Sequence, residues 1–386
     1  MGALTDLADL ADLPWIPVPP AWQIDWPQID AACPWLAPLA ATPQDPRHHA
    51  EGNVLIHTRM VAEALVALTD WQSLPAADRA LLFVAALLHD IGKPGTTRLA
   101  ADGTISAPHH ARLGAGLTRT MIWNGDLGLD LPFATREALV ALVRLHGLPI
   151  WFLSRDQFEQ AIIIASLSSR LDLVALLAEA DARGRICYDQ QDLLDRITMF
   201  REWCTEHGCL SAPFPFPNDH ARVRYCRGWQ DDPYYAAFDT SWGEVTLLSG
   251  LPGAGKDTWV HQHHGDQAVI SLDALRHTLG VEPEDAQAPV IEAAKQQARE
   301  LLRQQRPFIW NATNLTRHLR DPLGDLILNY HARLRIIYFD VPPQIAIERN
   351  HRRPHPVPDL VIRRLAARIE IPDLREAHSL HMVTTE

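Results

Sequence analysis

Several histidines and aspartates in the first half of the sequence have the residue types and the setting of a metal site. Each lies on or at the end of a stretch with helical periodicity, and the intervals are too long for one helix, so several helices must assemble the site. Imidazole and carboxylate ligands suit a divalent transition metal such as Mn²⁺, and two ions would stabilise the attacking and leaving oxygens of a phosphate ester. We expect two ions with Asp90 between them. The expected metal ligands are His57, His89, Asp90, His110, His146 and Asp181.

The setting of His89 and Asp90 carries most of this prediction. An apolar helix containing Leu87 and Leu88 ends in these two ionisable groups, and Gly92 follows as a stop. Burying such a pair is costly unless a metal or another partner satisfies it. A histidine taken alone is more often a surface or satisfied core residue, and a chain with 19 histidines places some by chance.

Two further groups near this pair would act on the substrate. Lys93 follows Asp90 by three residues, and His49 precedes the first expected ligand. Both are expected to add positive charge for a phosphate group. Asp90 and Lys93 are therefore the expected catalytic residues of a phosphohydrolase.

A second type of phosphate chemistry is indicated near residue 250. The run Gly250-Leu251-Pro252-Gly253-Ala254-Gly255-Lys256 fits GxxxxGK, follows a strand and opens a helix, which is the setting the motif requires. Backbone N–H groups of Gly250, Gly253 and Gly255 would cradle the phosphates of ATP or another NTP with Mg²⁺, and Lys256 would reach the β and γ oxygens. Asp257 stands where Ser or Thr usually contacts magnesium, with Thr258 next. The sequence leaves open which of the two serves.

Residues further along favour a kinase over an ATPase motor. Asp273 and Arg276 follow the second expected strand, at the crevice that the loop faces. Asp273 is placed to accept a proton from an attacking hydroxyl, a role compatible with capping a helix. Arg349 and Arg353 lie on an expected mobile lid, where guanidinium groups would stabilise charge on the transferred phosphoryl group.

The periodicity of the chain predicts the elements that position these residues. Apolar residues repeat at helical spacing over 53–186, so the first domain should be an all-α bundle. From Glu244 onward short apolar strands alternate with helices, which predicts an α/β domain with a parallel sheet. We expect strands at Val245–Ser249, Ala268–Ser271, Phe308–Asn311 and Arg335–Asp340. The domain boundaries are a Pro/Trp-rich arm (1–46), the helical phosphohydrolase (47–208), a linker (209–243) and the kinase (244–386).

Composition limits the cellular setting. The chain has 386 residues, 47% hydrophobic and 21% charged, with no apolar run of the roughly 18 residues that a membrane span needs. The acidic start lacks the basic region of a signal peptide, and the five cysteines form no CxxC pair. These features predict a cytoplasmic protein with reduced thiols and no membrane partner.

The net charge of −12 lies almost wholly in the first part of the chain. From Gly243 onward, 17 Lys and Arg face 18 Asp and Glu, and a basic cluster runs from Arg349 to Arg368. A phosphate backbone should therefore meet that cluster first.

The histidine and aspartate motifs resemble the HD phosphohydrolase superfamily, whose pattern is a first His, an adjacent His-Asp and a distal Asp. The resemblance runs from about His49 to Arg185, and its additional histidines are those of binuclear members. The matching runs are Val54-Leu55-Ile56-His57-Thr58-Arg59, Asp90-Ile91-Gly92-Lys93-Pro94, His110-Ala111-Arg112-Leu113-Gly114, Leu145-His146 and Ala180-Asp181-Ala182-Arg183-Gly184-Arg185.

The second domain looks like the 5′-hydroxyl polynucleotide kinases of the phage type, over about Glu244 to Glu376. In that family an Asp-x-x-Arg pair supplies the general base and a contact to the acceptor's 3′-phosphate, and Asp273 and Arg276 stand there. The family lid carries two arginines four residues apart and then Val-Pro, as do Arg349, Arg353 and Val357-Pro358. The run Asn311-Ala312-Thr313-Asn314 is also shared.

The order of the two domains resembles the bacterial HD-Pnk family. That resemblance implies removal of 2′,3′-cyclic or 2′/3′-monophosphates and phosphorylation of 5′-hydroxyls, with RNA or DNA ends as substrate and RNA favoured. No ligase signature is present in the sequence, which leaves room for a separate ligase as partner. Two other readings stay open: an HD hydrolase of small nucleotides fused to a nucleoside-type kinase, and a nucleotide-sensing regulator in which one site binds without turnover.

Overall fold

The computed structural model describes residues 8–128, 131–263, 265–282 and 285–384. The chain divides into two compact units, Met1–Pro215 and Phe216–Glu386, and each is described by itself. The stretch 209–243, expected as a linker, is shared between them, because helix α12 (Asp219–Cys226) belongs to the second unit. The Arg222 guanidinium on α12 donates to backbone oxygens of residues 374, 377 and 378, which fixes the helix there.

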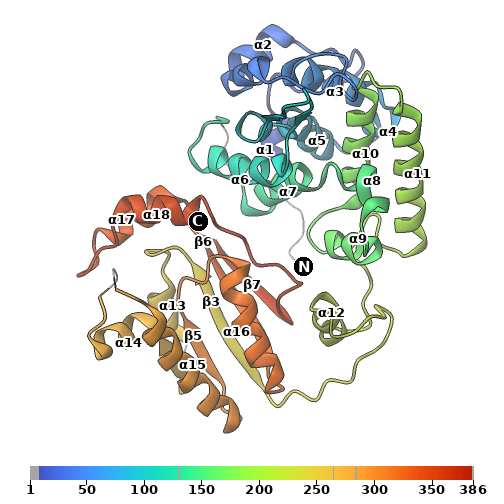
Figure 1. The fold of residues 1–386 in the computed structure, drawn as a ribbon. Coiled ribbons are helices and arrows are strands. Elements are labelled where there is room, and N and C mark those ends of the chain that lie inside the picture. Colours follow the sequence, from blue (N-terminus) through green and yellow to red (C-terminus); the bar gives the residue numbers. More distant parts are fainter. Residues whose placement is uncertain (1–7, 129–130, 264, 283–284, 385–386) are drawn as a thin grey trace. The chain divides into compact units, whose positions relative to one another are not determined.

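The first unit is a bundle of helices (Figure 1). Its helices range from three to 17 residues in length. In chain order they are α1 (Ala8–Ala11), α2 (Trp26–Ala32), η1 (Pro34–Ala41), α3 (Val54–Ala67), α4 (Thr69–Gln72), α5 (Ala76–Leu88), η2 (Lys93–Gly95), α6 (His110–Trp123), α7 (Phe133–Leu145), α8 (Leu148–Trp151), η3 (Phe152–Ser154), α9 (Phe158–Ser166), α10 (Leu171–Arg183) and α11 (Gln190–Glu206).

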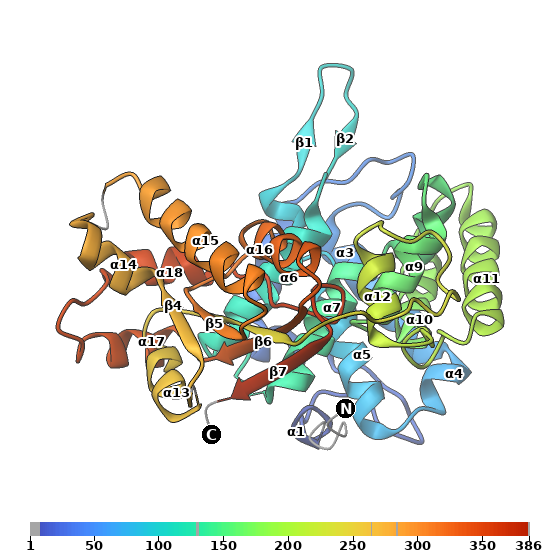
Figure 2. The same cartoon turned by 90° about the horizontal axis from the view of Figure 1, so that it is seen from below.

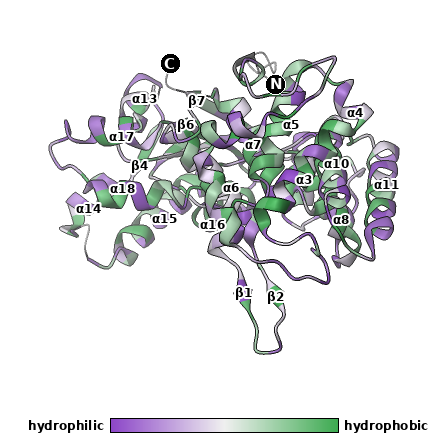
Figure 3. Cartoon of the chain, turned by 90° about the horizontal axis from the view of Figure 1, so that it is seen from above, coloured by the Kyte–Doolittle hydropathy of each residue, from purple (hydrophilic) through white to green (hydrophobic). Residues whose placement is uncertain are grey.

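Helix α5 forms the centre of this bundle. All of its residues from Ala80 to Leu88 are buried, and it packs against α1, α3, α7 and α10. A helix that is apolar on every side must lie in the interior. By contrast, α11 buries only Leu193, Ile197, Phe200 and Cys204, one stripe at helical spacing, and its other side is hydrophilic (Figure 3). The charged residues that end α5 are therefore carried into the core.

A small hairpin departs from the all-helical expectation for this unit. Strands β1 (Arg98–Leu99) and β2 (Ile105–Ser106) pair antiparallel and project from the bundle (Figure 2). Strands of two residues leave no alternation of polar and apolar residues that could be recognised in the sequence. The hairpin joins the segment of Lys93 to the helix that begins at His110.

The second unit is built on a five-stranded parallel sheet in the order β4-β5-β3-β6-β7. Strand β3 lies at the centre and pairs with β5 and β6 (Figure 1). The bounds are β3 (Glu244–Gly250), β4 (Ala268–Ser271), β5 (Phe308–Asn311), β6 (Arg333–Asp340) and β7 (Ser379–Thr384). The expected parallel sheet is confirmed, and the edge strand β7 is an addition to the four expected strands.

Helices cover this sheet through stripes of small and branched residues. Helix α15 buries Val290, Ala294, Ala298 and Leu302, one stripe at helical spacing, and packs on β4. The remaining helices are α13 (Lys256–His263), α14 (Leu272–Leu279), α15 (Ala288–Arg303), α16 (Arg317–Asn329), α17 (Pro343–Asn350) and α18 (Asp359–Ala366). All strands run parallel, so their carboxyl ends meet at one edge, where a ligand site is expected.

Among the residues that the structure describes, one helical stretch, Phe133–Ser154, is long and apolar enough to cross a membrane, and the bent pair Phe158–Ser166 and Leu171–Arg183 would count as a second. Half of the relevant window in the first stretch is buried inside the fold. Core helices of globular proteins pass the same test, so this is weak support for a membrane segment.

Candidate metal centre and phosphate-binding site

The six expected metal ligands converge in the core of the first unit. His57 lies in the first turn of α3, whose N-cap Asn53 accepts the N–H of Ile56 at 3.0 Å. His89 caps the carboxyl end of α5, and Asp90 follows it. The remaining three come from other helices: His110 begins α6, His146 caps the end of α7, and Asp181 lies in the last turn of α10.

Asp90 stands between two groups of histidines. Its Oδ2 lies 3.2 Å from His89 Nε2 and 3.7 Å from His57 Nε2, and its Oδ1 lies 3.3 Å from His110 Nε2. His57 Nε2 is also 3.1 Å from Asp181 Oδ1, while His110 Nε2 is 3.4 Å from His146 Nε2. The ligand atoms thus form two sets that share Asp90. This is the arrangement expected for two ions, and metal binding itself stays a prediction.

The histidine ring nitrogens show how well these residues fit a cation. Nδ1 of His89, His110 and His146 lies 2.7–2.8 Å from the backbone oxygen three residues earlier. A carbonyl can only accept, so Nδ1 carries the proton and Nε2 presents a lone pair. The Nε2 atoms of His89 and His57 face each other at 3.4 Å. When both rings are neutral and carry the proton on Nδ1, these lone pairs repel, and a cation between them relieves the repulsion.

The two buried carboxylates are held ionised. Burial opposes the charge on Asp90, but Lys93 and His89 overcome it and hold the pKa of Asp90 well below its usual range. Burial is likewise overcome at Asp181, where the Arg185 guanidinium donates two hydrogen bonds of 3.0 and 2.5 Å, so the pKa of Asp181 is also well below its usual range. Ionised carboxylates and imidazole nitrogens together are a donor set for divalent transition metals.

The two groups expected to supply positive charge differ in the structure. Lys93 Nζ lies 2.7 Å from Asp90 Oδ2 and donates to Gln44 Oε1 at 2.6 Å, so its ammonium is at the centre. Burial lowers the pKa of His49 to about 4. An imidazole with such a pKa would be neutral at pH 7, so the pKa does not support the expectation that His49 adds positive charge.

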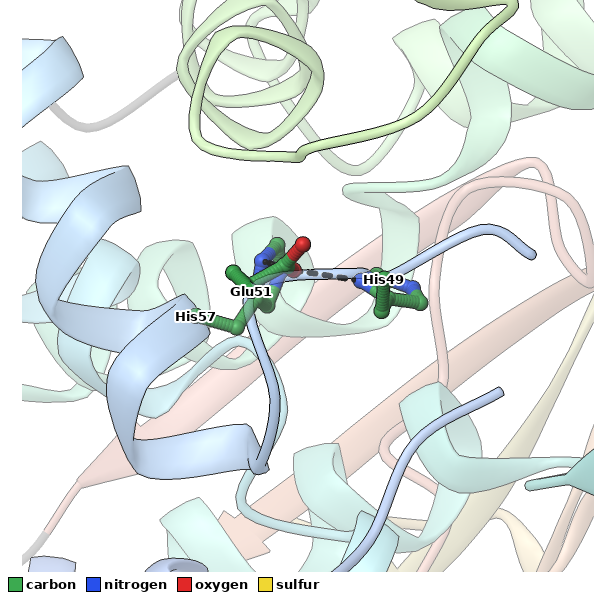
Figure 4. Close-up of side chains that lie close together, drawn as sticks. All are labelled: His49, Glu51 and His57. Atoms are coloured by element: carbon green, nitrogen blue, oxygen red, sulfur yellow. Dashed lines mark hydrogen bonds and ion pairs between the residues drawn. The ribbon is translucent and has the colours of Figure 1, made fainter. Parts of the chain in front are cut away.

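Sequence reasoning missed Glu51. Its side chain is fully buried, and its Oε1 lies 2.8 Å from His49 Nδ1 and 2.9 Å from His57 Nδ1 (Figure 4). The sequence around Glu51 carries no motif, because a carboxylate two residues from one histidine and six from another has no periodic signature.

The phosphate-binding loop of the second unit follows central strand β3. Gly253 and Gly255 adopt φ of 82° and 97°, a region that favours glycine. A Cβ on Gly253 would come within 2.2 Å of the backbone oxygen of Ala346, so the loop packs closely on α17. Lys256 Nζ donates to the backbone oxygens of Gly250 and Leu251 at 2.9 and 2.8 Å. Burial lowers the pKa of Lys256 to about 8.

Acidic and basic groups gather at the mouth of this loop. Asn311 at the end of β5 donates to Asp257 Oδ1 at 2.7 Å. Arg353 Nη2 lies 3.7 Å from Asp257 Oδ2 and 3.4 Å from Asp273 Oδ2. Asp273 lies in the first turn of α14, where Ser271, and not Asp273, is the capping residue. The structure thus brings the residue after Lys256, the expected base and a lid arginine to one point.

The other expected kinase residues lie around this point. Arg276 pairs with Asp273, and its Nε donates to Gln287 Oε1 at 2.6 Å. Thr258 is exposed on α13, and Arg349 is exposed in the last turn of α17. The structure therefore places Asp257, and not Thr258, in contact with Asn311 and Arg353.

Sequence reasoning also gave no role to Asn350. Its side chain is completely buried, donates to the backbone oxygen of Val357 at 2.7 Å and accepts the N–H of Val357 at 3.0 Å. These two bonds close the loop of residues 351–358, which carries Arg353. The only sequence signal for Asn350 was its position next to Arg349, an expected lid residue.

Family models match both halves of the chain. One described as an HD domain matches residues 54–174, and one described as an AAA domain matches residues 245–372. Together with the fold, they show an HD hydrolase domain followed by a P-loop kinase-like domain. The first match ends before Asp181, and it begins after Glu51.

Two curated relatives are similar to part of the chain. The multifunctional CCA protein of Methylococcus capsulatus is 31% identical over 168 residues, which cover 41% of this chain and 35% of that protein. The multifunctional CCA protein of Ralstonia nicotianae is 32% identical over 177 residues, covering 44% and 37%. The chain thus spans little more than a third of the length of these relatives.

Among solved structures, a gluconokinase from Sinorhizobium meliloti is similar at 19% identity, over 37% of this chain and 83% of that chain. The TM-score is 0.29. A likeness this low supports no conclusion about substrate or activity.

Proposed function

We propose that this protein heals nucleic-acid ends, as the HD-Pnk enzymes that it resembles would. In this proposal the HD domain removes 2′,3′-cyclic phosphates and 2′- or 3′-monophosphates, and the P-loop domain transfers the γ-phosphate of ATP to a 5′-hydroxyl. A 2′,3′-cyclic phosphate requires a ribose 2′-hydroxyl, so RNA is the favoured substrate. The resulting ends would suit a separate ligase.

The observation that carries the kinase half is the meeting of Asp273, Arg353 and the phosphate loop. Arg353 lies within 4 Å of both Asp273 and Asp257, the residue after Lys256. A carboxylate base, a lid cation and a phosphate cradle at one point are what transfer of a phosphoryl group to a hydroxyl needs. A motor ATPase would need no acceptor base at this place.

The openness of this site favours a polymer end over a small metabolite. The side chain of Asp273 is 64% exposed and that of Asp257 is 60% exposed. Sites for small molecules usually enclose most of the ligand surface. An exposed base can instead receive the terminal hydroxyl of a long chain. The exposed arginines Arg363 and Arg364 on α18 would contact the phosphates of that chain.

In the kinase reaction each residue has a definite task. Asp273 accepts the proton of the 5′-hydroxyl as that oxygen attacks the γ-phosphorus, the bond from the γ-phosphorus to the bridging oxygen breaks, and ADP leaves. Lys256 leaves the backbone oxygens of the loop for the β and γ oxygens. Arg353, with Arg349 on the same lid, then neutralises charge on the transferred group. Arg276 contacts the acceptor's 3′-phosphate. In doing so it gives up its ion pair with Asp273, which frees the carboxylate. Asp257 is the favoured side chain toward magnesium.

In the HD domain, six side chains would hold two divalent ions. Such ions act as Lewis acids on phosphoryl oxygens and favour an activated water. The chain supplies the frame: Asp90 lies between the two histidine sets, and Arg185 fixes Asp181. Lys93 places a positive charge beside Asp90, where it can offset the charge of a phosphate. The His110 side chain is 26% exposed, so substrate would enter on its side.

The proposal is tested with two oligonucleotides, one with a 5′-hydroxyl and one ending in a 2′,3′-cyclic phosphate. Transfer of labelled γ-phosphate should vanish in Lys256→Ala and Asp273→Ala while dephosphorylation survives. Dephosphorylation should vanish in Asp90→Ala while the kinase survives.

The outcomes separate the proposal from its alternatives. If free nucleosides or nucleotides are modified and neither oligonucleotide is, the protein is an HD hydrolase fused to a small-molecule kinase. If the protein binds ATP or nucleotide without turnover at one site, the regulator reading holds. Either result overturns the end-healing proposal.

A further inference from the structure

The four histidines of the metal centre are not oriented in the same way. His89 and His146 cap the carboxyl ends of their helices, where carbonyl groups lack intrahelical partners. Their Nδ1 atoms lie 2.7 and 2.8 Å from such carbonyls, at Ala86 and Val143. His110 uses the carbonyl of Ala107, just before its helix. Backbone oxygens therefore set three of the four rings.

The ring of His57 is not oriented by a backbone oxygen in this way. His57 lies in the first turn of α3, and its own N–H donates to the oxygen of Asn53 at 3.1 Å. Its Nδ1 is buried and makes no hydrogen bond of good geometry among the described residues, but it lies 2.9 Å from Glu51 Oε1, within ion-pair distance. The orientation of His57 thus depends on one carboxylate.

Glu51 is itself firmly held. Its Oε1 also lies 2.8 Å from His49 Nδ1, and its Oε2 accepts the N–H of Ile186 at 2.9 Å. Figure 4 shows Glu51 between the two histidine rings. Burial opposes ionisation, but the contacts with His49, His57 and Ile186 hold the pKa of Glu51 well below its usual range. The group facing His57 is therefore a carboxylate held in place by His49 and the Ile186 N–H.

The same carboxylate also joins two ligand-bearing segments. Ile186 follows Arg185, the residue that holds Asp181, and the N–H of Ala50 donates to the oxygen of Ile186 at 2.9 Å. Glu51 therefore links the loop before α3 to the turn after α10. A displacement of this carboxylate would reach both His57 and Asp181, whose ligand atoms are 3.1 Å apart.

We propose that Glu51 is a positioning residue of the metal centre, which fixes the tautomer and ring orientation of His57. Carboxylates behind ligating histidines act in this way, and removing one typically weakens metal binding about 10–100-fold. His49 holds the carboxylate in place as a neutral donor. This inference rests on the proposed metal-dependent activity of the HD domain.

The test measures binding of Mn²⁺ to the full-length protein by electron paramagnetic resonance of free Mn²⁺. Glu51→Gln keeps the shape and removes the charge, and Glu51→Ala removes both. We expect one of the two Mn²⁺ affinities, that of the His57 and His89 set, to fall about 10–100-fold. The second ion, on the His110 and His146 set, should bind nearly as before, and Glu51→Ala should lose more than Glu51→Gln.

The matched control is Asp78→Asn. Asp78 is another buried carboxylate of the same unit, 2.7 Å from Arg170, and it lies at the opposite end of α5 from the metal centre. Its substitution should lower the melting temperature and leave both Mn²⁺ affinities unchanged. Thermal unfolding of each variant without metal shows whether the fold persists.

The possible results are distinct. If both Glu51 variants bind two Mn²⁺ ions with the affinity of the unaltered protein, the positioning role is wrong while the proposed function stands. If both affinities fall together in proportion to a lowered melting temperature, Glu51 is only structural and the inference is again wrong. If the unaltered protein binds no divalent ion, the proposed phosphohydrolase falls, and the role of Glu51 falls with it.

Discussion

The two phosphate sites of this chain are built in opposite ways. The HD centre is buried and assembled: the side chains of His57, Asp90 and Asp181 are 2% exposed or less, and their partners are in place. At the P-loop the key carboxylates Asp257 and Asp273 are more than half exposed. The geometry of the HD centre therefore depends on how the fold packs. The geometry of the kinase site depends on the nucleotide and the acceptor that bind there.

The charges follow the same division. In the HD centre, Lys93 and Arg185 each contact a buried carboxylate, because an unpaired charge in the core would be very costly. At the kinase site Arg353 is shared by two exposed carboxylates, and contacts of this kind are worth little in water. Arg353 can therefore leave its partners for a phosphate at small cost, which suits a lid.

The largest expected effect tests this open arrangement. Arg353→Ala should lower kcat for 5′-phosphorylation about 10³–10⁵-fold, because the lid would no longer bring its cation to the transferred phosphoryl group. Dephosphorylation by the HD domain should not change. Initial rates with a 5′-hydroxyl oligonucleotide and with a 2′,3′-cyclic phosphate oligonucleotide measure the two activities.

Its matched control is Arg352→Ala, an exposed neighbour on the same lid loop. This variant should retain kinase activity within a few-fold. Equal losses in the two variants would mean that general positive charge on the lid matters, and not the meeting of Arg353 with Asp273.

The buried centre should be sensitive to packing instead. A Cβ on Gly92 would lie 2.2 Å from the backbone oxygen of His110, so Gly92→Ala must push α6 away from the centre. We expect a loss of about 2–3 kcal/mol in the free energy of unfolding of the first unit, together with loss of dephosphorylation. Denaturant unfolding and end dephosphorylation measure the two effects.

The control lies on the helix that Gly92 touches. Gly116 in α6 has open space where the Cβ of an alanine would stand, so Gly116→Ala should stabilise the helix by about 0.5–1 kcal/mol. If Gly92→Ala is as well tolerated as Gly116→Ala, the centre is less tightly assembled than the contrast with the kinase site requires.

Asn350 tests whether the open site needs a shaped lid. Asn350→Ala removes both hydrogen bonds to Val357 and leaves the backbone groups of Val357 to find water. With each of the two bonds contributing about 1 kcal/mol, we expect kcat of the kinase to fall about 30-fold. Steady-state kinetics check this, with KM for ATP recorded as well. Unchanged kcat would show that the loop carrying Arg353 keeps its shape without Asn350.

The smallest expected effect is the uptake of a proton by Lys256 when ATP binds. Burial lowers the pKa of Lys256 to about 8, so above that pH the nucleotide-free loop carries a neutral amine. ATP favours the ammonium, so binding should take up as much as one proton near pH 9 and little near pH 6.5, and affinity should fall as pH rises. Calorimetry in two buffers of different ionisation enthalpy measures the uptake.

Lys256→Arg is the control for this titration. A guanidinium stays charged throughout this range, so the uptake near pH 9 should disappear. Uptake that persists in the arginine variant would assign the proton to another group and leave Lys256 charged in the nucleotide-free loop.

Much of this molecule was accessible to sequence reasoning. Strands Ala268–Ser271 and Phe308–Asn311 match their predicted bounds, because short apolar runs between polar turns are unambiguous in a parallel sheet. The six expected metal ligands could be selected because an apolar helix ending in His89 and Asp90 demands a partner, and their binding of a metal stays a prediction. The phosphate loop was evident from its glycines.

Other features depend on packing between segments far apart in the chain. Neither the hairpin β1–β2 nor the edge strand β7 has a strong periodic signal. Glu51, whose buried carboxylate meets His57 and Ile186, follows no spacing rule. The neutrality of His49 comes from burial that the sequence does not display.

The sequence by itself thus determined which chemical groups are available and which local elements carry them, because helical period, strand runs and glycine loops are short-range properties. Only the tertiary structure decided which groups meet. It placed Asp90 between two histidine sets and put Arg353 beside Asp273, 80 residues away in the chain. The physical reason is that burial, charge pairing and ring orientation arise from neighbours in space.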